Sequence, residues 1–303
     1  MNVMNLNSNK LEMNEMQFQI SFQNENVFDS EIVVCMLVYN NGSEVADAIY
    51  SVREQETSRK IAILIIDGGQ GDDWHSHVLS FEGIAIVKIS DYTIAQARNL
   101  SHQISSMVFP CAKWLCRLDA DDVLDSQFSI ETIAAKLEAE GSEINWAITG
   151  NSLSQSGSRI NRVNRPEEGL FQTKTLISRL QRMVEGEPDA ELPSCNLWIK
   201  PNFRAIYPDI GSAEDHWLVT HLLINQPEEG VILHDCLFAN YSLSGNNSEV
   251  NRSNGSHQES RRKLCASAIF WSTEDYEANE EICIGWGSEG VVWLKNGRIR
   301  KRF

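Results

Sequence analysis

The sequence predicts an α/β domain in which helices flank a mostly parallel β-sheet. Apolar runs of strand length alternate with segments whose apolar residues recur at helical spacing, over about 120 residues. The runs are apolar throughout, as expected of strands that are buried on both faces. Polar residues follow several of these runs directly. Open parallel sheets bind ligands beyond the carboxyl ends of their strands, so the polar residues indicate a site there.

Five apolar runs are predicted to be strands, and they span 32–38, 61–66, 84–89, 114–118 and 146–149. Three helices are predicted between these strands, because the apolar residues there recur on one side of a helix. The first helix follows a candidate N-cap at Ser43. The second helix contains Ile94, Ala97, Leu100 and Ile104. The third helix carries Ile130, Ile133, Ala134 and Leu137 and is expected to end near Gly141. Strands alternating with helices imply right-handed crossovers and therefore a parallel sheet.

The pattern is less regular after Gly150. We expect a loop or hairpin over 151–170 and an irregular segment over 188–208. A helix is predicted from Glu214 over 214–224, followed by one or two strands over 231–243 and a mobile polar segment over 244–260. The Asn- and Glu-rich start of the chain is expected to be a flexible leader. The predicted organisation is a leader over 1–30, an α/β domain over 31–250, and a linker with a short C-terminal extension over 251–303.

Composition excludes several classes of protein. The 303 residues carry 26 Lys and Arg against 42 Asp and Glu, a net charge of −16, which argues against general nucleic-acid binding. No apolar run approaches the roughly 18 residues of a membrane-spanning helix, and the N-terminus does not resemble a signal peptide. The seven cysteines form no CxxC pair, which favours free thiols in a cytoplasmic protein. A basic tail over 291–303 leaves open a peripheral association with a membrane surface.

The strongest local signal is the cluster Asp119-Ala120-Asp121-Asp122 at the end of a predicted buried strand. Three carboxylates this close repel one another and need a cation, N–H donors or full hydration. Carboxylate oxygens suit Mg²⁺ or Mn²⁺, with a diphosphate completing the coordination shell. The alternative is a solvated acidic turn that precedes the next helix.

Two weaker signals accompany this cluster. Glu214 and Asp215 stand at the start of a predicted helix, where an acidic pair is also favourable with the helix dipole. Asp67 precedes Gly68 and Gly69, which allow a tight turn and the close approach of a ligand. Taken alone, each of these signals is equally compatible with a helix end or a plain turn.

The order of the motifs resembles the family 2 inverting glycosyltransferases, which have the GT-A fold of nucleotide-diphospho-sugar transferases. Six segments carry the resemblance over residues 32–248: the strand that ends in Tyr39-Asn40, the turn Asp67-Gly68-Gly69, Ala97-Arg98-Asn99, the DxD motif Asp119-Ala120-Asp121-Asp122, Glu214-Asp215 and the closing segment 241–248. Each motif is modest by itself. Six in the family's order are specific.

The resemblance implies a role for each matching residue. Tyr39 would stack on the nucleobase, Asp67 would accept its hydrogen bond, and Arg98 would face the diphosphate. Asp119 would hold the ribose or the donor sugar, and Asp121 would bind Mn²⁺ or Mg²⁺, with Asp119 as a second candidate ligand. Asn40 and Asp122 are also assigned to donor binding, Asp215 is the expected general base, and its neighbour Glu214 is the second candidate.

The implied activity is hexosyltransferase-like. A sugar moves from a nucleotide-diphosphate donor to a glycan or saccharide-lipid acceptor of polysaccharide biosynthesis, with inversion at the anomeric carbon. A carboxylate base and a cation on the leaving group suffice for this step, whereas glycosidases use two facing carboxylates. Two alternatives stay open: a catalytically silent nucleotide-sugar-binding or scaffold module, and the transferase part of a bifunctional transferase–kinase polypeptide.

Two features depart from the family pattern or lie outside it. Ser244 stands where many relatives have a histidine that helps to bind the metal or phosphate, and His234 or His257 is the candidate substitute. In the tail, residues 285–292 fit G-x-G-x-x-G-x-V and resemble the glycine-rich loop of a protein-kinase-like N-lobe, which implies a kinase-like domain downstream in a longer polypeptide. The alternative is a glycine-containing hairpin with a basic end.

Overall fold

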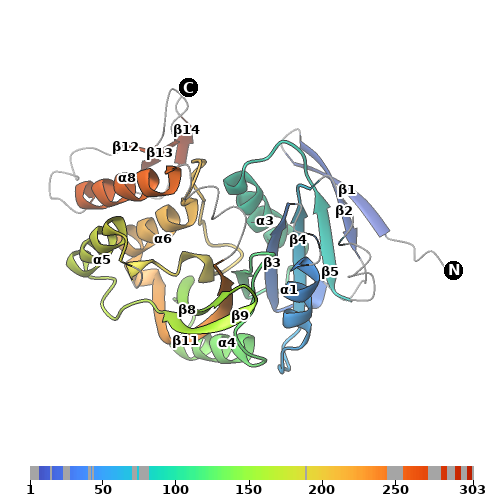
Figure 1. Ribbon diagram of the computed structural model, residues 1–303. Helices are drawn as coiled ribbons and strands as arrows, with labels where there is room; N and C mark the ends of the chain where they lie inside the picture. The colour runs from blue at the N-terminus through green and yellow to red at the C-terminus, as the bar shows by residue number, and fades with distance from the viewer. Residues whose placement is uncertain are drawn as a thin grey trace.

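A computed structural model gives the fold of the chain. It describes residues 7–13, 16–22, 28–39, 42, 44–69, 74, 82–187, 190–243, 255–271, 281–284, 291–294 and 299–301. The expected α/β class is confirmed: a central sheet contains a parallel block and carries helices on both faces (Figure 1).

The five predicted strands all exist. β5 (Ile84–Lys88), β4 (Ile61–Asp67), β3 (Ile32–Val38) and β6 (Trp114–Arg117) form the parallel block in this order. The short strand β10 (Leu197–Ile199) pairs antiparallel with β6 and with β8 (Trp146–Gln155). β11 (Gly230–Ser242) runs parallel to β8, and β7 (Val123–Leu124) pairs with β11 at the edge. β9 (Ser158–Asn164) forms a hairpin with β8, which confirms one of the two alternatives for 151–170.

Alternate residues of the strands face two separate cores. Val33 and Cys35 belong to the core that α3 (Ile94–Val108), α5 (Thr173–Glu185), α6 (Glu214–Asn225) and α8 (Ser256–Trp271) cover. Val34 and Met36 belong to the opposite core, under α1 (Glu44–Arg53) and α4 (Ser129–Glu140). Both faces of β3 are therefore buried, which explains why its sequence is apolar throughout.

The end of each parallel strand places polar residues at one edge of the sheet. β3, β4 and β6 are in parallel register, so Tyr39, Asp67 and Asp119 all follow carboxyl ends at this edge. α3 begins there with a capping box, in which the Thr93 side chain accepts from the Gln96 amide and the Gln96 side chain accepts from the Thr93 amide. The local signals in the sequence therefore converge in space.

The expected flexible leader is wrong for two of its segments. Residues 7–13 form β1 (Asn7–Met13) and residues 16–22 form β2 (Met16–Phe22); β1 pairs with β2, and β2 pairs antiparallel with β5. The sequence Met-Gln-Phe-Gln-Ile-Ser-Phe over 16–22 alternates apolar and polar residues, the period of a strand with one covered face. This alternation outweighs the Asn-rich composition.

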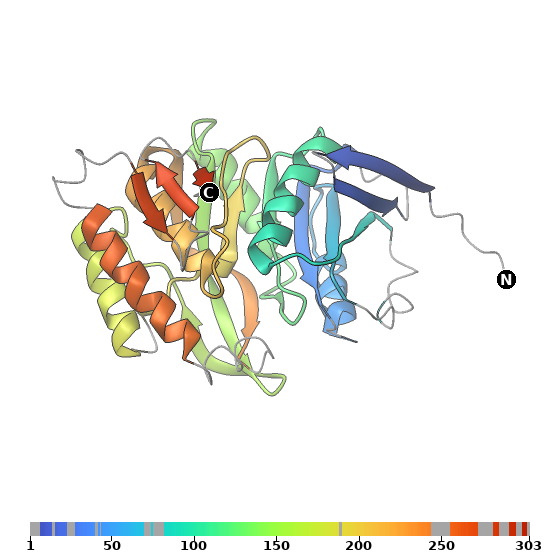
Figure 2. The same cartoon turned by 90° about the horizontal axis from the view of Figure 1, so that it is seen from above.

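The expected linker from residue 251 is also wrong for the segment that forms α8. Leu264, Cys265 and Ala268 of this helix are buried in the same core as α3 and α6. Figures 1 and 2 both show α8 lying alongside α5, and α8 also contacts α6. The helix was missed because its first half, residues 256–263, is polar and charged like the segment before it. The expected mobile segment 244–260 falls partly on this helix, and residues 244–254 lie outside the described residues.

The C-terminal extension contains three short strands. β12 (Glu281–Ile284), β13 (Val291–Leu294) and β14 (Ile299–Lys301) form an antiparallel sheet in this order. The glycine-rich residues 285–290 lie outside the described residues, so the kinase-like glycine loop stays a prediction. Within the described part of the chain, no helix combines the length and the apolar character needed to cross a membrane.

Candidate active site

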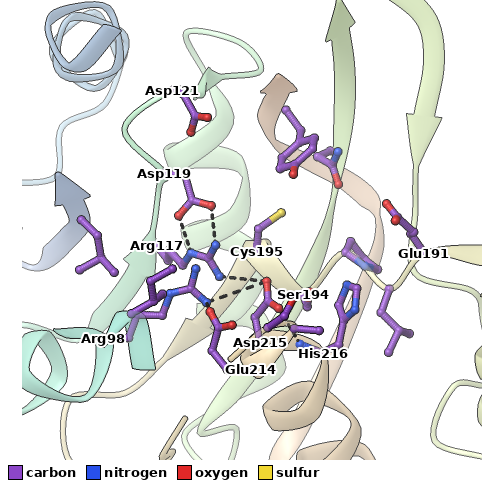
Figure 3. A pocket seen from close by; sticks show the side chains of 18 of the residues that line it. Arg98, Arg117, Asp119, Asp121, Glu191, Ser194, Cys195, Glu214, Asp215 and His216 are labelled. Atoms are coloured by element: carbon purple, nitrogen blue, oxygen red, sulfur yellow. Dashed lines mark hydrogen bonds and ion pairs between the residues drawn. The ribbon is translucent and has the colours of Figure 1, made fainter. Parts of the chain in front are cut away.

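A pocket of about 250 Å³ opens at the carboxyl edge of the sheet (Figure 3). Six residues singled out from the sequence line it: Tyr39, Arg98, Asp119, Asp121, Glu214 and Asp215. They come from the ends of β3 and β6, from α3 and from the first turn of α6. The fold thus joins a DxD turn to an acidic pair almost 100 residues later in the chain.

The other predicted donor-binding residues lie elsewhere. Asp67 is fully buried, accepts the Gly69 amide at 2.9 Å and pairs with Lys88 at 3.3 Å. Asp122 is 3% exposed and accepts the backbone amide of Ser242 at 2.7 Å, which ties the DxD turn to β11. Neither is among the described residues that line the pocket. Asn40 lies outside the described residues.

Arg117, at the end of β6, links the two acidic motifs. Its Nε donates to one oxygen of Asp119 at 2.6 Å, and its Nη2 donates to the other. Its Nη1 donates to Asp215 at 3.2 Å. In Figure 3 the guanidinium points between the two carboxylates. A single buried cation thereby fixes the DxD turn against the start of α6, with the planar fork geometry that Arg provides.

The Ala-Arg-Asn motif of α3 holds the opposite wall. Arg98 forms an ion pair with Glu214 and stacks over the Tyr207 ring at 5.3 Å. The Asn99 side chain donates to the Tyr207 carbonyl at 2.9 Å and accepts its amide at 2.8 Å. The motif therefore fastens the loop before α6, and this loop delivers the acidic pair to the pocket.

The two acids of the pair have opposite electrostatics. Burial raises the pKa of Glu214 despite the neighbouring Arg98. Burial also opposes ionisation of Asp215, but the combined effect of His216, Arg117 and Arg98 outweighs it and keeps the pKa of Asp215 well below its usual range. Asp215 is therefore an ionised carboxylate at neutral pH. The residue before the pair, Ala213, has a φ of 63°, a strained left-handed conformation of the kind that clusters at functional sites.

Asp121 is the acid in this pocket with the best chemistry for a cation. Burial and then the neighbouring Asp119 raise the pKa of Asp121 to about 6, and Arg117 offsets only part of this rise. Both oxygens of Asp119, by contrast, are taken by Arg117. No cluster of three or more His, Cys, Asp or Glu side chains within the described ranges could hold a metal. These residues fit a divalent cation that takes one or two protein oxygens and completes its shell with diphosphate and water.

Several lining residues were not found from the sequence. Arg117 could have been noticed as a charge inside an apolar strand. Glu191 and Arg261 form an ion pair in the pocket wall, and neither stands in a recognisable motif. Of the two histidines considered, His257 lines the pocket, whereas His234 is exposed and lies near Glu168 at 3.3 Å.

The comparison with protein families identifies the chain. The profile described as glycosyl transferase family 2 matches residues 33–187, just over half of the sequence. The chain belongs to glycosyl transferase family 2. The resemblance in the motifs is thus confirmed at the level of the family, and the chain has the fold of a nucleotide-sugar transferase. The match ends before the acidic pair and before α8.

Solved structures agree with this fold. S. aureus TarS 1–349 matches with a TM-score of 0.53 at 11% identity, over 82% of this chain and 74% of that chain. Its complex with UDP matches over the same shares, with a TM-score of 0.53 at 12% identity. A longer S. aureus TarS chain matches with a TM-score of 0.51 at 11% identity, over 79% of this chain and 43% of that one. At such identities the likeness shows the fold alone. Among curated proteins, none matches the sequence.

Proposed function

We propose that this family 2 member is a metal-dependent inverting glycosyltransferase that moves a sugar from a nucleotide-diphosphate donor to a glycan or saccharide-lipid acceptor. One observation carries the proposal: a single pocket contains the DxD turn, the acidic pair and two buried arginines. We expect donor and acceptor to approach Asp215 from opposite sides of this pocket. The pocket sits at the edge of the sheet where α/β folds of this kind bind ligands.

The donor side is assigned from exposure and charge. Tyr39 is 64% exposed at the pocket rim, where its ring can stack on a nucleobase. Asp121 and its neighbour Asp119 would hold Mn²⁺ or Mg²⁺ and the donor. Because Arg117 fixes the carboxylate of Asp119, this residue is better placed to bind the hydroxyls of the donor. The cation, when bound, stabilises the negative charge that develops on the departing diphosphate.

Asp215 is the proposed general base, with Glu214 as its positioning neighbour. Being ionised, Asp215 can take the proton from the acceptor hydroxyl as the oxygen attacks the anomeric carbon from the face opposite the diphosphate. Arg117 and Arg98 weaken its basicity in the ligand-free pocket. Both arginines line the pocket, so the charge of a bound diphosphate offsets them and makes Asp215 a stronger base.

The proposal is tested by nucleotide release from a panel of UDP-, GDP- and TDP-sugars, with and without Mn²⁺. S. aureus TarS shares the fold and has been crystallised with UDP, so UDP-sugars come first. We expect Mn²⁺-dependent release from one donor class. Asp215→Asn should lower the rate by about 10²- to 10⁴-fold, the usual contribution of a general base, and keep nucleotide binding.

The same assay separates the transferase from a silent binding module. A silent module would bind a nucleotide yet release none from any sugar donor, and Asp215→Asn would then change nothing. Equal rates for wild type and Asp215→Asn with an active donor would remove Asp215 from the mechanism, and Glu214→Gln would be the next variant.

A further inference from the structure

The pocket has a second half that the family match does not cover. Its wall comes from Glu191 and Ser194, from His216 on α6, and from His257 and Arg261 on α8. In Figure 3, Asp121 lies on one side of Asp215, and His216 and Glu191 lie on the other. This half therefore faces the proposed base from the side away from the DxD turn, where an acceptor would lie.

Two buried polar atoms in this half lack a partner among the described residues. Arg261 is 8% exposed, and its Nη2 pairs with Glu191, yet its Nε has no hydrogen bond. His216 is 7% exposed, and its Nδ1 likewise has none. A buried polar group left without a partner destabilises the fold until a ligand or water satisfies it. A ligand with acceptor oxygens could satisfy both atoms.

The cluster is rigidly built. The Ser212 hydroxyl and His257 Nδ1 lie 3.1 Å apart, which sets the orientation of this imidazole. Ser260 on α8 donates to the Ser212 carbonyl at 2.7 Å and accepts Trp217 Nε1 at 3.1 Å. These bonds tie α8 to α6, so the basic groups are in place before a ligand arrives.

The side chains of this half can donate hydrogen bonds to an anion. The donors are Arg261, His216 and His257, and the two acids beside them, Glu191 and Asp215, are already paired with Arg261 and Arg117. Burial, and then the neighbouring Arg261 and His216, lower the pKa of His257 to about 4. An oxyanion beside these imidazoles would favour their protonated forms and so raise their pKa values.

We propose that Arg261, His257 and His216 form an acceptor subsite that binds an oxyanion, a phosphate or a carboxylate, carried by the acceptor substrate. The assignment of this ligand as the acceptor rests on the proposed transferase function. The oxyanion site itself rests on the residues of this half. Glu191 orients Arg261 by holding its Nη2 and leaves Nε for the ligand.

The test is calorimetric titration of the metal-free full chain with glucose 6-phosphate, glucuronate and glucose. We expect one of the two anionic sugars to bind at least about tenfold more tightly than glucose, and the one that does identifies phosphate or carboxylate. Arg261→Met and His257→Gln should each remove most of this preference. Arg262→Met, on the exposed side of the same helix, is the matched control and should keep it. Since Arg261→Met also breaks the ion pair with Glu191, thermal melting is measured for each variant, and His257→Gln stands as the milder test.

A second titration, with UDP and Mn²⁺, separates this inference from the proposed function. If both variants bind UDP like wild type, the cluster is distinct from the donor site, as we infer. Equal binding of all three sugars to wild type, or a preference that survives in His257→Gln, would overturn the subsite. The subsite would also be overturned if the variants lost UDP binding to the same extent as sugar binding, because the cluster would then belong to the donor site. Failure of every nucleotide to bind wild type would count against the transferase and leave the oxyanion site standing.

Discussion

Residues 33–187 and residues 190–271 build the two walls of one pocket by different means. In the first region several lining residues follow strands of the parallel block, as Tyr39 follows β3 and Asp119 follows β6. In the second region they lie on helices and loops that hydrogen bonds and ion pairs hold together, as Arg261 holds Glu191. The wall of the first region, the proposed donor wall, therefore follows largely from the sheet, whereas the wall of the second region, the proposed acceptor wall, depends on contacts between elements distant in sequence.

This difference explains where the family signal ends. Strand ends of a parallel sheet converge whatever the details of side-chain packing, so short motifs there retain a readable order. The second wall can change with the acceptor while the sheet stays the same. The family match over 33–187 agrees with this division, and of the six motifs only Glu214-Asp215 and the closing segment 241–248 lie beyond it.

The largest expected effect is at the point where the two regions meet. Arg117 is 10% exposed and is the buried cation between Asp119 and Asp215. Arg117→Met leaves both carboxylates without it, and we expect a loss of about 3–5 kcal/mol in the free energy of unfolding. Urea unfolding measures this loss. The double variant Arg117→Met/Asp119→Asn should recover part of it, and a neutral effect of Arg117→Met would show that the two walls do not depend on this ion pair.

The next effect tests whether α8 belongs to the folded domain. Leu264 is fully buried in the core shared with α3 and α6. Leu264→Ala should lower the free energy of unfolding by about 3 kcal/mol, as expected for a cavity in a packed core. Ile269 on the same helix is 40% exposed, so Ile269→Ala should cost much less. Similar small losses for both variants would restore the view of this segment as a linker.

A pH effect is expected from α6 in the second region. Burial lowers the pKa of His221 to about 3, whereas its unfolded value is near 6.5. Below pH 6.5, His221 therefore binds a proton in the unfolded chain but not in the folded chain, and the free energy of unfolding decreases as pH falls. Between pH 7 and pH 5 the loss from this group is about 2 kcal/mol. His221→Gln should show a correspondingly smaller decrease in urea unfolding over this interval. An unchanged decrease would mean that His221 is protonated in the folded protein.

The smallest effect concerns the exposed rim of the donor wall. Tyr39→Ala should weaken nucleotide binding by about tenfold, within the range of base–aromatic stacking, without changing thermal stability. Tyr39→Phe keeps the ring and should bind like wild type. Tyr50→Ala, at a 55% exposed site on α1 that is outside the described lining of the pocket, is the control. Equal binding by Tyr39→Ala would place the nucleobase elsewhere.

Much of the first wall could be predicted from the sequence because its signals are local. The continuous apolar run of β3 and the acids after β6 are each visible within ten residues. The Arg117–Asp215 contact joins residues 98 positions apart, and nothing near either residue indicates its partner. The same holds for Glu191 and Arg261, whose pairing needs α8 to pack beside α6. The alternation over 16–22 was a local signal as well, and composition concealed it.

The measurement that tests the central claim most directly is calorimetric binding of UDP, GDP and TDP, with and without Mn²⁺, to wild type and to Asp121→Asn. Asp121 lines the pocket beside Asp119 and makes no ion pair within the described residues. We predict that one nucleotide binds tightly, that this binding needs Mn²⁺, and that Asp121→Asn loses it. Binding that does not depend on Mn²⁺, or that survives in Asp121→Asn, would contradict the account and leave the acidic cluster as a structural turn.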